Sequence, residues 1–131
     1  MRIIPTRIHG ILDYLVGAFL VVTPWAFGFW RNGAESWTPI WLGAAAILYS
    51  LLTNYELGVA KLLSMRTHLW LDFASGVLLA LSPWIFRFSD HVYIPHVVLG
   101  LTEIVVVFMT DLHPYARVER GRPHAVHPPI R

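Results

Sequence analysis

The chain has 131 residues, a length typical of a single domain. Hydrophobic residues make up 56% of it and charged residues 14%, against about 45–50% and about 25% in soluble domains, and the mean hydropathy is +0.55. This composition excludes a soluble enzyme and a disordered chain, and the absence of cysteine excludes disulfides and thiol chemistry. The formal net charge is only +2, and we expect no nucleic-acid partner.

Four stretches with few or no charges follow one another along the chain, at residues 11–30, 37–55, 69–86 and 92–110. Each has the length of a helix that crosses the hydrocarbon core of a bilayer, which takes about 17–25 residues. Helices are expected because a lone strand cannot satisfy its backbone groups in lipid. We therefore predict an all-α, polytopic membrane protein with four transmembrane helices.

The basic residues lie mainly on one side of these four spans. Eight are on that side, namely Arg2, Arg7, Lys61, Arg66, Arg117, Arg120, Arg122 and Arg131, and two are on the other, Arg31 and Arg87. By the positive-inside rule, both termini and the middle loop face the cytoplasm.

The loops between the spans differ in length. The outer loops, 31–36 and 87–91, are short, so each flanking pair of spans forms an antiparallel hairpin. The inner loop, 54–67, is predicted to be either an amphipathic helix at the interface or a cytoplasmic extension of the second span. After the transmembrane domain (1–112) comes a basic, proline-rich cytoplasmic tail (113–131) with little to bury, whose Arg residues contact anionic lipid.

The chain contains two tandem copies of one unit, repeat one at residues 7–56 and repeat two at residues 66–113. The pairs at an offset of 59 include His9 and His68, Asp13 and Asp72, Gly17 and Gly76, and Pro24 and Pro83; those at an offset of 57 include Gly43 and Gly100, Ile47 and Ile104, and Thr53 and Thr110. Because each unit holds two spans, the repeats are parallel. They are therefore related by a pseudo-two-fold axis along the membrane normal.

Small residues at equivalent places in the two repeats indicate where helices approach each other closely. Glycine has no side chain to keep two membrane helices apart. We expect Gly17, Gly43, Gly76 and Gly100 to be packing positions, with Gly43 and Gly100 the best candidates for contact between helices.

The most specific repeated motif is Thr23-Pro24-Trp25 and Ser82-Pro83-Trp84, each with a Gly seven residues before the Pro. With this motif twice in register, the chain resembles the SPW-repeat family of small bacterial membrane proteins over residues 7–110. The resemblance implies a two-span repeat and a multi-pass location in the bacterial inner membrane. It supplies no catalytic residues, because the family has no established activity to carry over.

The Ser/Thr-Pro-Trp triplet is interpreted first as a structural device. The Pro kinks or ends its helix, and the hydroxyl of Thr23 or Ser82 satisfies backbone groups that the break frees. The aromatic residues around the triplets form a belt at the outer interface. They are Trp25, Phe27, Phe29, Trp30, Trp84, Phe86 and Phe88. The alternative is that the broken helix end forms part of a binding pocket.

A second repeated pattern, Arg-x-His-x-x-x-Asp, lies at the cytoplasmic ends of the first and third spans. The spacing of four places His9 with Asp13, and His68 with Asp72, on one helical face. We favour an arrangement in which Arg7, Arg66 or the His pairs with each Asp near the helix N-terminus. In the alternative, both pairs meet at the pseudo-two-fold axis and bind a divalent metal such as Zn, Mn or Fe.

Glu103 lies inside the fourth span and aligns with Ala46, so it has no charged counterpart. An intramembrane carboxylate indicates a proton relay, an ion path or a partner contact, and His96 is on the same face seven residues earlier. Equally, Glu103 would be satisfied by a neighbouring polar side chain. The candidates are Thr102, Ser75 and Tyr14.

Three functions follow from these features. We favour a structural or accessory membrane protein, without enzymatic activity, metal or cofactor, that packs in the bilayer against itself or another membrane protein. The second is transport of a proton or small ion by Glu103 and His96, with Asp13 and Asp72. The third is binding of a metal or cofactor at the cytoplasmic His/Asp pairs.

Overall fold

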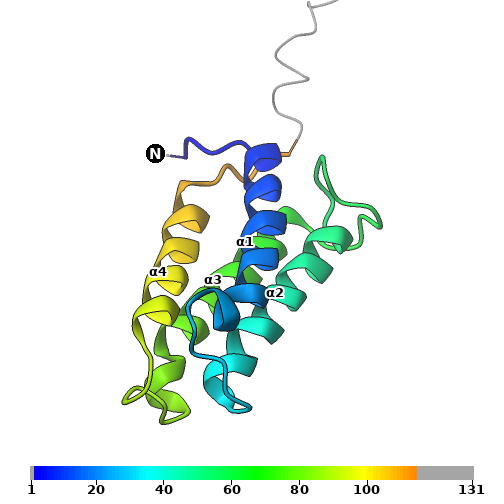
Figure 1. The fold of residues 1–131 in the computed structure, drawn as a ribbon. Coiled ribbons are helices and arrows are strands. Elements are labelled where there is room, and N and C mark those ends of the chain that lie inside the picture. The colour runs from blue at the N-terminus through cyan, green and yellow to red at the C-terminus, as the bar shows by residue number, and fades with distance from the viewer. Residues whose placement is uncertain (1, 115–131) are drawn as a thin grey trace, which may run out of the picture.

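A computed structural model describes residues 2–114, and within this range the chain forms four helices (Figure 1). They are α1 (Thr6–Ala26), α2 (Ala34–Leu52), α3 (Met65–Ile85) and α4 (Ile94–Met109). The same range contains isolated bridges but no strand. The predicted all-α class is therefore confirmed. Residues 115–131, which hold most of the predicted tail, lie outside the described part.

The Pro of each triplet lies close to the end of its helix, since α1 and α3 end two residues after Pro24 and Pro83. A Pro lacks the N–H that would bond the carbonyl four residues earlier. For Pro83 this is the carbonyl of Leu79, and the Ser82 hydroxyl donates to it at 2.7 Å. The Thr23 hydroxyl instead donates to the carbonyl of Phe19, at 2.7 Å. The triplet thus ends each helix, and its hydroxyl replaces the missing donor in repeat two.

The helices pack mainly as two hairpins, α1 with α2 and α3 with α4, and α2 joins the hairpins through contacts with α3 (Figure 1). In each hairpin, a pair of glycines brings the two backbones close together. A Cβ placed on Gly17 would lie 3.0 Å from the carbonyl oxygen of Gly43, and one on Gly100 would lie 2.5 Å from that of Gly76. The structure therefore places the four glycines as two equivalent crossing points.

Apolar side chains lie on the outside of this bundle, and much of its interior is polar. Exposed residues include Leu15, Trp41, Trp70 and Phe108, whereas His9, His68, His96 and several Thr and Ser are buried. Two helices, α1 and α3, are long and apolar enough to cross a bilayer, and α4 is apolar but shorter. These features indicate weakly that the protein is associated with a membrane.

The inner loop forms neither of the two predicted helical structures, because α2 ends at Leu52 and α3 begins only at Met65. Thr53 and Leu63 instead form a bridge, and the amide of Leu63 donates to the carbonyl of Leu52 at 2.9 Å. Buried Tyr55 holds the loop against α1, where its ring occupies the space beside Gly10. Tyr55 is therefore buried without helix formation, whereas Val59 and Leu62 of the same loop remain exposed.

Candidate metal centre

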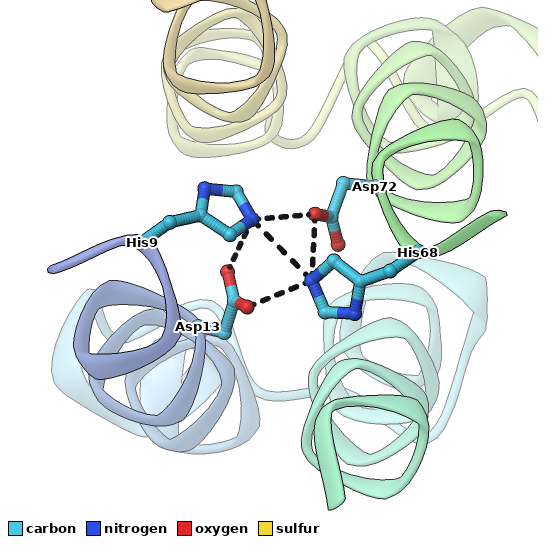
Figure 2. A group of neighbouring side chains, drawn as sticks. All are labelled: His9, Asp13, His68 and Asp72. Carbon is cyan, nitrogen blue, oxygen red and sulfur yellow. Dashed lines mark hydrogen bonds and ion pairs between the residues drawn. The ribbon is translucent and has the colours of Figure 1, made fainter. Parts of the chain in front are cut away.

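Four ionisable side chains converge in the interior, at the end of the bundle where α1 and α3 begin (Figure 2). His9 and Asp13 come from consecutive turns of α1, and His68 and Asp72 come from the equivalent turns of α3. The two imidazoles are 1% and 0% exposed. One ligand atom from each of the four residues lies within 4.8 Å of all the others.

The shortest contacts in this cluster cross between the repeats. His9 Nε2 lies 2.9 Å from Asp72 Oδ2, and His68 Nε2 lies 2.9 Å from Asp13 Oδ2. The pairs within each helix are slightly longer, at 3.3 Å for His9 with Asp13 and 3.1 Å for His68 with Asp72. The two Nε2 atoms are 3.3 Å apart. Both imidazoles therefore point toward the same small region of space.

The outer nitrogen of each imidazole contacts a threonine. Thr53 Oγ1 lies 2.9 Å from His68 Nδ1, and Thr110 Oγ1 lies 2.9 Å from His9 Nδ1. Each hydroxyl already donates its hydrogen to the carbonyl four residues earlier on its own helix, at 2.6 and 2.7 Å. It must then accept from the imidazole, so Nδ1 carries the proton. In the neutral ring, this leaves the Nε2 lone pair directed into the cluster.

Both carboxylates also receive hydrogen bonds, and both donors come from α2. The Tyr49 hydroxyl donates to Asp72 Oδ1 at 2.6 Å, and the Ser50 hydroxyl donates to Asp13 Oδ2 at 3.2 Å. The aligned positions on α4 are Val106 and Val107. The hydrogen-bond donors to the carboxylates therefore come from α2, and the aligned positions on α4 are apolar.

The geometry and chemistry of these four side chains fit a tetrahedral metal ion. An ion with metal–ligand bonds of about 2.0 Å has ligand–ligand edges of about 3.3 Å. The contacts of the two imidazoles measure 2.9–3.3 Å, with Asp13 contacting the two histidines through different oxygens, and the four ligand atoms lie within 4.8 Å of one another. Imidazole nitrogen and carboxylate oxygen suit Zn, Mn and Fe. Hydrogen bonds from the far side of each imidazole are the usual means of orienting histidine ligands.

The arginines of the repeated pattern do not take part. The structure leaves Arg7 and Arg66 exposed, and the ion pairs that it describes for Asp13 and Asp72 are all with histidine. Each arginine lies six residues before its Asp, nearly two turns away, whereas a histidine lies one turn away. Of the predicted partners, the structure therefore shows the histidines and not the arginines, and the histidine contacts extend across both repeats.

A cavity of about 100 Å³ adjoins the cluster on the α4 side. His9, Asp13, Asp72 and Glu103 line it together with apolar side chains. Its volume exceeds what one water molecule needs, which is roughly 10–15 Å³. Glu103 therefore shares a cavity with three of the cluster residues.

Glu103 has no hydrogen bond to two of the partners that the sequence suggested, Thr102 and Tyr14. Its Oε2 is buried without a hydrogen bond within the described chain. The hydroxyls of Thr102 and Tyr14 instead donate to the carbonyls of Val98 and Leu57. The expected bonds to these two hydroxyls are therefore wrong, because nearby backbone carbonyls accept both hydrogens.

His96 lies at the other end of α4, about 10 Å from Glu103 along the helix axis. Its Nε2 is 2.9 Å from the carbonyl oxygen of Glu35, and the rings of Phe29 and Phe88 pack around it at 5.3 and 4.9 Å. Phe88 is only 3% exposed, so its predicted place in an outer aromatic belt is wrong. The structure does not bring His96 and Glu103 together.

Trp25 and Trp84 of the triplets are each 54% exposed, at the end of the bundle opposite the cluster. Trp25 stacks on Trp30, with ring centroids 4.6 Å apart. The triplets therefore lie far from the candidate metal centre and contribute none of its ligands.

Sequence reasoning missed the four hydroxyls that surround the cluster. Thr53 and Thr110 had a signal, because they align at the offset of the second helix in each repeat. Tyr49 and Ser50 had none, because repeat two has Val at both positions. The repeat pattern could therefore have identified the imidazole partners but not the carboxylate partners.

The comparisons with known proteins agree with the repeat structure. The family model of the SPW repeat domain matches residues 7–110, which span the cluster and all four helices. No curated protein and no solved structure matches the chain. The resemblance carried by the two Ser/Thr-Pro-Trp triplets is thus confirmed, and the chain belongs to the SPW repeat family.

Proposed function

We propose that this protein is a membrane module whose two repeats are held together by one divalent transition-metal ion, bound by His9, Asp13, His68 and Asp72. The observation that carries the proposal is the direction of the two imidazoles. Both turn a nitrogen toward one point that two carboxylates share, and both have the other nitrogen occupied by a threonine. Of the ions that suit these ligands, Zn²⁺ is almost always four-coordinate in structural sites.

Charge gives further support for a metal. Two neutral imidazoles and two carboxylates carry a net charge of −2, which one divalent ion neutralises. Two imidazolium rings would also balance the charge, but their Nε2–H groups would face each other across 3.3 Å. Each ring would lie 2.9 Å from a carboxylate that stabilises it, but the two like charges would still repel each other in a buried site. An ion between the four ligands removes this conflict.

The proposal places all four helices across a bacterial inner membrane, with the repeats related by a pseudo-two-fold axis along its normal. Exposed side chains such as Leu15, Leu48, Trp70 and Val105 support four spans, because a soluble protein rarely exposes so much apolar surface. The basic residues near the cluster support a cytoplasmic position for that end and for both termini.

The role of the ion is structural in this proposal. A metal with four protein ligands is typical of structural sites, whereas catalytic sites keep a position open. The two hairpins are otherwise joined mainly through α2 and α3, so an ion bound by α1 and α3 adds a direct link between the repeats. This agrees with a non-enzymatic module that packs against itself or another membrane protein.

The test is metal analysis of the full chain purified in detergent without chelator and loaded with Zn²⁺. We expect one Zn²⁺ per chain, resistant to dialysis. Asp72→Asn keeps the shape of the ligand but removes its charge, and we expect it to abolish stoichiometric binding. His96→Gln is the matched control, because His96 is equally buried but contacts a carbonyl away from the cluster.

The same preparation gives a second readout, the resistance of the fold to unfolding by a denaturing detergent. Zn²⁺ binds only the folded cluster and should raise this resistance in the wild type and in His96→Gln, but not in Asp72→Asn. A wild type that binds no Zn²⁺, Mn²⁺ or Fe²⁺, and whose stability is the same with and without chelator, would show that the cluster is an ion-pair network.

Transport of a proton or small ion is a second candidate, favoured by the cavity that joins Glu103 to the cluster. His96 does not belong to this path, because it lies at the other end of α4. Ion flux in proteoliposomes that disappears in Glu103→Gln would support transport. Equal flux in protein-free vesicles and in proteoliposomes would exclude it.

A further inference from the structure

A second feature lies on the outer surface of repeat two, away from the cluster. A groove of about 330 Å³ is lined by residues from the start of α3 and the end of α4. The chain begins at the same end of the bundle (Figure 1). Leu69, Phe73 and Val107 are among its apolar walls, and Trp70 and Phe108 stand at its edges, 66% and 64% exposed.

Two cations complete this apolar groove. Arg2, before α1, and Arg66, in the first turn of α3, both line it. Neither has a carboxylate partner among the described residues. Guanidinium groups bind phosphate through several N–H donors at once. The groove therefore combines anion-binding groups with an apolar surface along the bundle wall.

The equivalent face of repeat one is filled by the chain itself. Gly10 and Tyr14 align with Leu69 and Phe73. The ring of Tyr55, which is fully buried, occupies the space beside Gly10, and the Tyr14 hydroxyl donates to the carbonyl of Leu57 at 3.1 Å. The inner loop thus covers in repeat one what repeat two leaves as a groove.

We propose that this groove binds an anionic phospholipid, with its phosphate between Arg2 and Arg66 and an acyl chain along Phe73 and Phe108. The inference rests on the membrane location proposed above. Charge favours an anionic lipid over the rest of the chain as the occupant. The groove carries two cations, and residues 115–131 are themselves basic, with four Arg and one Glu, so the two would repel each other. Lipid also supplies the apolar chain that the walls fit and that a soluble anion lacks.

Trp70 provides a local probe, because it alone of the six tryptophans lines the groove. The full chain is reconstituted into phosphatidylcholine vesicles with a minor fraction of phosphatidylglycerol. Bromine, which quenches tryptophan fluorescence, is placed either on the phosphatidylglycerol chains or on an equal amount of phosphatidylcholine. The signal of Trp70 is the difference between wild type and Trp70→Phe. We expect brominated phosphatidylglycerol to quench Trp70 more strongly.

The expected preference is about fivefold for each arginine, from roughly 1 kcal/mol for each basic residue near an anionic surface. The Arg2→Gln/Arg66→Gln double variant should lose it. Arg7→Gln should keep it, because Arg7 is the counterpart of Arg66 in repeat one. Circular dichroism checks that each variant keeps its helices.

Four outcomes would overturn the proposal. One is equal quenching of Trp70 by the two brominated lipids, as expected if another segment or a second copy of the chain covers the groove. Another is loss of the preference on adding excess inorganic phosphate, which would indicate a site for a soluble anion. The third is an unchanged preference in the double variant. If brominated phosphatidylcholine quenches no tryptophan, membrane insertion itself has failed, and the groove proposal falls with it.

Discussion

The two repeats share the residues that build the cluster but differ in what surrounds it. His, Asp, Gly and Thr recur at equivalent places, and each set makes the equivalent contact. The flanking helices differ: α2 provides Tyr49 and Ser50 as donors to the carboxylates, whereas α4 provides Val106 and Val107 beside the cavity that holds Glu103. The duplicated residues thus form the cluster, and the unduplicated ones make its two sides chemically different.

The surface shows the same contrast. In repeat one, the inner loop fills the space beside α1 with Tyr55 and contacts Tyr14 through the carbonyl of Leu57. In repeat two, the corresponding face is a groove lined by Arg2 and Arg66. The residues that the two repeats share therefore build one common site, and the residues that differ give the two repeats different surfaces. Substitutions that alter the shared residues should have the largest effects.

The glycine crossing points should be the least tolerant of the shared positions. Gly43→Val and Gly100→Val each place a Cβ against the backbone of the facing helix, so the hairpin must separate. We expect a loss of about 3 kcal/mol or more in stability, or no folded protein. Ala44→Val is the control: it adds similar bulk at an exposed position beside Gly43 and should change stability by about 0.5 kcal/mol or less. Equal losses in all three variants would contradict the crossing points.

Much of this arrangement was predictable from the sequence, because charge-free stretches and repeat offsets can both be identified in a single sequence. The helices and the paired His and Asp residues followed from them. The cross-repeat contacts did not, since spacing places His9 beside Asp13 but says nothing about its distance to Asp72. The inner loop was mispredicted because its apolar residues resemble a helix, while its structure depends on the packing of Tyr55 against Gly10.

The threonines should have the next largest effect. Thr53→Val and Thr110→Val each keep the shape of the side chain but remove the group that fixes the proton on Nδ1 of one histidine. Loss of such outer partners typically lowers metal affinity by about 10–100-fold. We expect this range from competition with a chelator. Thr102→Val is the control, because its hydroxyl bonds only to a backbone carbonyl on an exposed face. Full affinity in both cluster variants would mean that packing alone orients the imidazoles.

A smaller effect is expected where the repeats differ after the triplets. Gly28 and the aligned Arg87 both have left-handed backbones, with φ of 67° and 59°. Glycine adopts this conformation without the steric cost that other residues incur. Arg87→Gly should therefore stabilise the protein by about 0.5–1 kcal/mol, and Gly28→Ala should destabilise it by a similar amount. Unfolding in a denaturing detergent measures both, and changes of the same sign would contradict the shared turn.

The smallest effect on metal binding is expected at Glu103, although it is the most unusual residue of repeat two. It lines the cavity beside the cluster, but its Oε2 bonds to no described residue, and the proposed metal site already has four other ligands. Glu103→Gln should therefore leave the Zn²⁺ affinity unchanged in the same chelator competition. Asp13→Asn, also a carboxylate on the cavity wall, should abolish binding. A loss of affinity in Glu103→Gln would make Glu103 a fifth ligand, and the site would no longer be a closed structural one. If Glu103→Gln keeps its Zn²⁺ affinity but changes the ion flux, the two sides of the cluster have different functions. The metal is then held between the repeats, and ions move only on the α4 side.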